Sequence, residues 1–188
     1  MKMIHWISVV LLTLTTAPFA MADNYTSTLE NFRDAGAAAF VDDAYGYAIF
    51  PSIGKGGIGI GGAYGEGGVF EQGDMIGEAK LKQITIGFQL GGQAYSQVIF
   101  FQDKRAFDEF VSGSFEFGAQ ATAVALTSAA SAEVTTGGGT GTSVSGGENN
   151  ANITSGGYYK GMAVFTIAKG GLMYEASIGG QQFKFKPL

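Results

Sequence analysis

Apolar and small residues alternate with a period of two along residues 57–70. Ile58 and Ile60 lie on one side of this pattern, which continues through Tyr64 and Phe70, while glycines and Ala63 occupy the other side. A period of two is typical of a β-strand, because successive side chains point to opposite faces. The pattern therefore predicts a strand with one bare face, against which another backbone or an aromatic ring can pack closely.

Short apolar runs elsewhere predict further strands. Residues 47–50 form a buried strand that ends at Pro51, residues 79–102 hold two strands, and residues 158–186 hold two or three. Residues 115–134 are rich in alanine, which favours a helix, but Phe115 and Phe117 begin an alternating pattern that favours a strand. We interpret this segment as a strand.

Two segments have helical spacing instead. Residues 25–44 repeat Leu29, Phe32, Gly36 and Phe40 at intervals of three to four, and a second helix follows Asp103 and stops at Gly113. Together the elements predict an α+β fold, in which a curled, mainly antiparallel, glycine-rich β-sheet carries two helices.

The start of the chain resembles a secretion signal. Lys2 is followed by an apolar run that is too short to span a bilayer as a helix, and then by Ala20-Met21-Ala22. We expect residues 1–22 to be removed, leaving residues 23–188 as a single domain with a flexible Gly/Ser/Thr/Asn loop at 135–157. The protein is then exported, with a periplasmic or envelope-associated location.

The composition excludes several function classes. The chain has no cysteine, and its single histidine, His5, lies in the predicted leader. Nucleophilic triads that use histidine or cysteine and the usual zinc sites are therefore not expected. A net charge of −5 disfavours nucleic acid as a partner. We expect no enzyme activity, no catalytic residues, no cofactor and no metal.

Two overlapping G-x-G-x-x-G matches occur, one from Gly54 to Gly59 and one from Gly57 to Gly62. A dinucleotide site needs this motif between a strand and a helix, so that the helix N-terminus meets the pyrophosphate. The residues that follow, Ala63 to Gly68, cannot form a good helix. The motif therefore does not indicate nucleotide binding.

Three sequence stretches resemble the SYLF family, also called the Ysc84 or DUF500 family. They are "YGYAIFPSIGKGGIGIGGAYGEGGVF", "ITIGFQLGGQAYSQVIFFQDKRAFDEFVSG" and "FEFGAQATAV", and the similarity extends over roughly residues 36–180. The resemblance implies lipid binding, described for phosphoinositides in eukaryotic members. This sequence differs from the family at "GDMIGEAKLKQ", where the family often has a Trp-Ser-x-Pro element. The acidic residues of the 25–44 helix also differ from the basic segment to which eukaryotic lipid binding is attributed.

The candidate lipid-binding residues are of two kinds. The apolar side chains of Leu29, Phe32 and Phe40 could insert into lipid, or could simply pack on the sheet. Lys55 and Lys169, each followed by Gly-Gly, could meet lipid phosphates together with free backbone N–H groups, or could be solvated turn residues.

The sequence thus predicts a non-catalytic protein of the bacterial cell envelope that binds a phospholipid or a membrane surface. The alternative is a small outer-membrane β-barrel or a structural envelope protein. Alternation and glycine content favour a barrel, whereas the two helices and the continuous apolar run at 98–101 do not.

Overall fold

The computed structural model describes residues 18–58, 60–86, 91–119, 121, 123–126, 158–170 and 177–188. Within these residues one open sheet of eight strands has the order β5-β8-β3-β2-β1-β4-β7-β6. The strands are β1 (Gly46–Ile58), β2 (Ile60–Glu71), β3 (Asp74–Ile86), β4 (Gly91–Phe101), β5 (Ser114–Glu116), β6 (Val124–Leu126), β7 (Met162–Lys169) and β8 (Gln182–Pro187). All neighbours are antiparallel except β6 and β7, which are parallel. The predicted α+β class with a mainly antiparallel sheet is confirmed.

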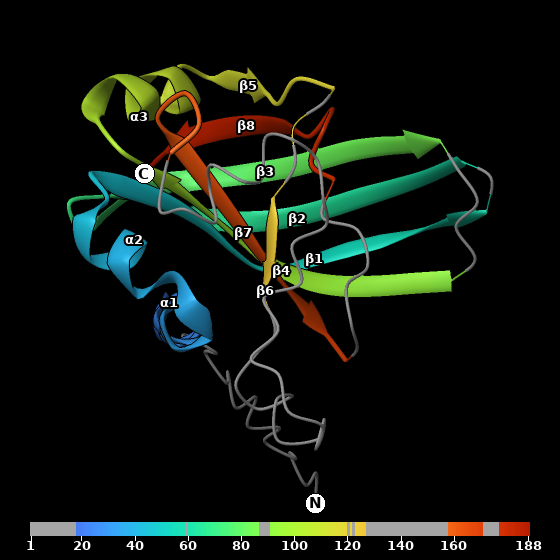
Figure 1. Ribbon diagram of the computed structural model, residues 1–188, viewed down its shortest axis with the longest axis horizontal. Coiled ribbons are helices and arrows are strands. Elements are labelled where there is room, and N and C mark those ends of the chain that lie inside the picture. Colours follow the sequence, from blue (N-terminus) through green and yellow to red (C-terminus); the bar gives the residue numbers. More distant parts are fainter. Residues whose placement is uncertain are drawn as a thin grey trace, which may run out of the picture.

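Helices lie on both faces of this sheet (Figure 1). α1 (Pro18–Phe32), η1 (Arg33–Ala37) and α2 (Ala38–Asp43) cover one face, here called the α1 face. α3 (Lys104–Val111) covers the other, the α3 face. Each face has its own apolar core. Figure 1 also shows β7 and β6 running steeply across the direction of β2 and β3, as expected for a curled sheet.

The N-terminal helix is not the single helix predicted for residues 25–44. It begins at Pro18 and is kinked at Gly36, whose φ of 114° lies outside the helical region. Glycine tolerates this conformation because it has no Cβ. The predicted cleavage after Ala22 falls within α1, and removal of residues 1–22 stays a prediction.

The predicted end of a strand at Pro51 is also wrong, since β1 continues to Ile58. Proline cannot donate to a ladder, and the pairing of β1 shifts at this point against both β2 and β4. The Pro51 carbonyl instead accepts a 2.9 Å hydrogen bond from the Ser96 hydroxyl. A bulge at Pro51 therefore allows β1 to continue past the proline.

The strand predicted over 57–70 is divided between two strands. β1 ends at Ile58 and β2 begins at Ile60, and the two pair as an antiparallel hairpin. Along β2 the alternation is confirmed, but Gly65, Gly67 and Val69 form part of the buried side, on the α3 face. The predicted glycine face is thus the interior of the curled sheet.

Residues 115–134 do not form one strand in the part that the structure describes. β5 and β6 lie at opposite edges of the sheet. Between them the chain crosses the α3 face, where Phe117 and Ala121 exchange backbone hydrogen bonds with Ile178, Gly180 and Gln181. The predicted loop at 135–157 lies outside the described residues.

The second helix agrees with its prediction. The Asp103 carboxylate accepts a 2.9 Å hydrogen bond from the Ala106 N–H, which caps α3, and Gly113 follows the helix with a φ of 121°. Phe107 and Phe110 are buried in the α3-face core, so the helix is anchored by its aromatic side.

Candidate functional site

A strip of exposed glycine lies on the α1 face of the sheet, near the β1–β2 hairpin. Gly54 on β1 pairs with Ala94 on β4 and with Tyr64 on β2, and Gly62 pairs with Ile84 on β3. A Cβ on Gly54 would have no other atom within 4 Å, and one on Gly92 would come only to 3.9 Å from the Lys55 carbonyl. The backbone is therefore bare and accessible here.

Three large apolar side chains stand beside this strip. Ile60 is 70% exposed, Ile84 is 79% exposed and Tyr64 is 47% exposed. Their strand registers place all three on the α1 face, beyond the area that the N-terminal helices cover. Exposed apolar side chains that gather on one face often mark a binding surface.

Lysines surround these apolar residues on the same face. Lys82 is the β3 partner of Tyr64, Lys169 on β7 is the partner of Ala94, and Lys184 on β8 is the partner of Lys80. In the part of the chain that the structure describes, Lys82, Lys169 and Lys184 have no carboxylate within ion-pair distance. We call this surface the open face; it consists of Gly54, Gly62, Gly92, Ile60, Tyr64, Ile84, Lys82, Lys169 and Lys184.

One carboxylate on the open side of β2 is neutralised locally. Glu66 accepts a 2.5 Å hydrogen bond from the Tyr64 hydroxyl and forms a 2.9 Å ion pair with Lys80. The Tyr64 hydroxyl, and after it the Lys80 ammonium, lowers the pKa of Glu66. Glu78 on β3 is exposed on the same side, opposite Lys186. A third acid, Glu116 on β5, is the partner of Gln182 on this side of β8. The five lysines on this side, which are Lys80, Lys82, Lys169, Lys184 and Lys186, outnumber the three acids, so the face is locally basic in an acidic chain.

The structure separates the predicted lipid-binding residues. Phe32 and Phe40 are buried between the N-terminal helix and the sheet, and Leu29 packs partly against the same core. They are therefore not available to lipid in this structure. Lys169 belongs to the open face, whereas Lys55 is paired with Gln93 and points to the α3 face. The two lysines lie near the same end of the sheet but on opposite faces.

Sequence reasoning missed the other lysines of this surface. Lys80 and Lys82 flank Leu81, and Lys184 and Lys186 flank Phe185, so each strand has a basic and an apolar side. This repeated Lys-apolar-Lys pattern could have shown the basic face. Lys184 does not lie on a free edge of the sheet, because β5 pairs with β8 over residues 182–184.

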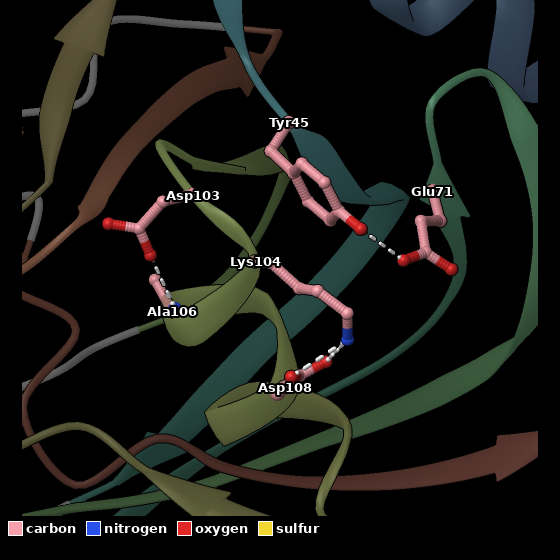
Figure 2. Close-up of polar contacts among 6 residues, drawn as sticks. All are labelled: Tyr45, Glu71, Asp103, Lys104, Ala106 and Asp108. Carbon is pink, nitrogen blue, oxygen red and sulfur yellow. Dashed lines mark hydrogen bonds and ion pairs between the residues drawn. The ribbon is translucent and has the colours of Figure 1, made fainter.

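A second polar cluster lies where β1 and β2 meet α3 (Figure 2). The Tyr45 hydroxyl donates a 2.6 Å hydrogen bond to Glu71, which raises the pKa of Tyr45. Lys104 forms an ion pair with Asp108 one helical turn later, at 2.6 Å. These contacts fasten the start of β1 to the end of β2 and stabilise the first turns of α3; they do not converge on an open space.

The α3 face contains a buried amide pair. Gln97 on β4 and Gln181 each donate an amide hydrogen bond to the other, at 2.9 and 3.1 Å, and Gln181 also donates to the Tyr95 hydroxyl at 3.3 Å. Burial raises the pKa of Tyr95. The pair is satisfied internally, which favours a structural role.

The described residues contain no group of three or more acidic, histidine or cysteine side chains that could hold a metal ion. None of their helices combines the length and the apolar character that crossing a membrane requires.

Comparison with known proteins places this arrangement in a family. The Ysc84 family, described as Las17-binding protein actin regulator, matches residues 82–185, which include all three lysines of the open face. The chain belongs to the Ysc84 family. A relative, Beta cell expansion factor A of Aeromonas veronii, is 30% identical over 164 residues. That match covers 87% of this chain and 54% of the relative, so the chain spans about half the length of that relative.

Proposed function

We propose that this protein binds anionic lipid surfaces without catalysing a reaction, and that the open face is the part that contacts the lipid. The observation that supports this most strongly is that three exposed large apolar residues share one side of an acidic chain with lysines that have no ion-pair partner among the described residues. The resemblance to the SYLF family, whose members are described as lipid-binding, points in the same direction.

The two kinds of side chain suit a bilayer surface for different reasons. An isoleucine that enters the interface gains about 1.5–3 kcal/mol if it becomes fully buried. Each lysine near an anionic surface contributes about 1 kcal/mol to binding. Acidic groups elsewhere on the molecule oppose this little, because salt largely screens charges that lie more than about 8 Å away. The bare strip around Gly54 removes side chains that would hold the sheet away from the headgroups.

The proposed location is the bacterial cell envelope, as a periplasmic or membrane-associated protein. This part of the proposal is based on the predicted leader at 1–22. An envelope location would give the open face access to phospholipid headgroups.

The test is co-sedimentation of the full chain with anionic and with zwitterionic vesicles at low and at high salt. We expect binding to anionic vesicles only, weakened by salt. Replacing Lys82 and Lys184 by glutamine should weaken binding about 30-fold. In the matched control, glutamine replaces Lys55 and Lys160, which lie off the open face. This control should bind anionic vesicles as the unmodified protein does.

A second pair of variants tests the apolar part of the face. Ile60→Ser combined with Ile84→Ser should weaken vesicle binding with little change in melting temperature, because both side chains are already exposed. If these variants bind vesicles normally but change the mass of the protein in solution, the face joins two copies of the chain and the lipid proposal is wrong.

A further inference from the structure

A cavity of about 610 Å³ lies on the α3 face, on the opposite side of the sheet from the open face. Its walls come from α3, from the segment that crosses the sheet after β5, from the turn before β7 and from β7 itself. Figure 1 shows that turn beside α3, and a 2.8 Å backbone hydrogen bond from Gln102 to Gly161 holds the two together. The volume is within the range of about 300–1,000 Å³ that is typical of ligand pockets.

The interior of this cavity is apolar. Its lining includes aromatic and aliphatic side chains from three separate segments: Phe115, Phe117, Met162, Val164 and Ile178. They belong to the core that fills the concave side of the curled sheet, or pack against it. Such a wall can hold a hydrocarbon chain but offers few hydrogen bonds to a polar ligand.

The rim of the cavity is charged. Arg105 donates a hydrogen bond to the Lys160 carbonyl at 3.2 Å, and its guanidinium approaches Glu109 at 3.6 Å. Glu116 accepts a hydrogen bond from Gln182 at 3.1 Å. Each of these groups therefore already has a partner.

Lys160 differs from the other charged rim residues. It lies in a tight turn with a φ of 52°, and its ammonium group is 5.5 Å from the centre of the Tyr159 ring. No carboxylate lies within ion-pair distance of it among the residues that the structure describes. It is exposed at the rim of an apolar cavity, where it can meet an anion.

We propose that this cavity binds one single-chain anionic amphiphile, such as a fatty acid or a lysophospholipid. The hydrocarbon chain occupies the apolar interior, and the carboxylate or phosphate lies at Lys160. This site is independent of vesicle binding by the open face, because the two lie on opposite faces of the sheet. The protein would then hold a single lipid molecule in addition to contacting a lipid surface.

The test uses the delipidated full chain and fatty acids of increasing length, below the concentration at which they form micelles. We expect saturable binding of one molecule per chain, and an affinity that rises about fourfold for each added methylene until the cavity is full. Alcohols of equal length, which lack the charge, should bind less tightly than the acids.

Two variants locate the site. Ala121→Phe places a ring at the cavity wall and should abolish binding of acids and alcohols alike. Lys160→Glu should weaken the binding of acids about tenfold while leaving the binding of alcohols unchanged. The control is Lys169→Glu, which makes the same charge change on the other face of the sheet and should bind acids normally.

Several outcomes would overturn the proposal. They are the absence of saturable binding at every chain length, binding that Ala121→Phe does not change, and equal loss of acid binding in the Lys160→Glu and Lys169→Glu variants. Mass spectrometry of the protein as purified distinguishes a fatty acid from a lysophospholipid, and either supports the proposal. The Ile60→Ser/Ile84→Ser protein should still bind fatty acids, so failure of the open face can be told apart from failure of the cavity.

Discussion

Glycines on neighbouring strands of the sheet have different roles that depend on the face they occupy. A Cβ on Gly67 would lie 2.4 Å from the Ile49 carbonyl oxygen and 2.6 Å from the Phe50 ring, on the buried α3 face. A Cβ on Gly54 would meet nothing within 4 Å, on the open α1 face. Gly67 is therefore needed for packing, whereas Gly54 keeps a surface bare.

The two glycines give a matched pair of variants. Gly67→Ala should lower the free energy of unfolding by about 1–3 kcal/mol, because the methyl group overpacks against the Phe50 ring and the backbone. Gly54→Ala should leave stability unchanged or raise it by up to about 1 kcal/mol, since alanine loses less conformational entropy on folding. Denaturant unfolding measures both, and equal effects would refute the distinction between the two faces.

At the scale of elements, local sequence signals set where α3 begins and ends. Asp103 caps the first turn, Gly113 takes a left-handed conformation after the last, and aromatic residues lie on the buried side between them. The N-terminal helix lacks such clear boundaries, and its kink at Gly36 interrupts the helical spacing of its apolar residues. The helix with explicit caps was accordingly the one predicted correctly.

The cap of α3 can be tested directly. Asp103→Ala removes the acceptor of the Ala106 N–H and should cost about 1 kcal/mol of stability. Asp103→Asn keeps an acceptor oxygen and should restore most of that loss. If the asparagine variant is as unstable as the alanine variant, Asp103 acts through its charge toward Arg105 rather than as a cap.

At the scale of the whole molecule, the curled sheet is held by contacts between residues far apart in the chain. Gln97 lies on β4, the third strand from one edge of the sheet, while Gln181 precedes β8, the second strand from the other edge. Their reciprocal amide bonds join these two regions across the α3 face. The sheet remains open, but its concave side is closed by this contact and by α3.

This coupling predicts a non-additive result. Gln97→Leu alone leaves the Gln181 amide buried with a partner missing and should cost about 1–3 kcal/mol. Replacing both residues by leucine should cost less than the sum of the two single changes, with a coupling of about 0.5–3 kcal/mol. A double-mutant cycle by thermal or chemical unfolding measures this term, and the exposed Gln182→Leu serves as the control. Strict additivity would show that the amide pair does not hold the sheet.

The sequence by itself determined the strand periodicity of residues 57–70, the two helical regions, the cap at Asp103 and the family. These features depend on contacts within a few residues of the chain, so local patterns predict them. The same reasoning predicted that glycines form one face of β2 and that a large group packs against it.

Only the tertiary structure decided which side of each strand is covered. A period of two shows that a strand has two faces, but which face is buried depends on distant elements, here α1 and α3. For that reason Ile60 and Tyr64 are exposed while Gly65 and Gly67 are buried, and Lys55 and Lys169 lie on opposite faces. The open face and the cavity both depend on which face of each strand these distant elements cover.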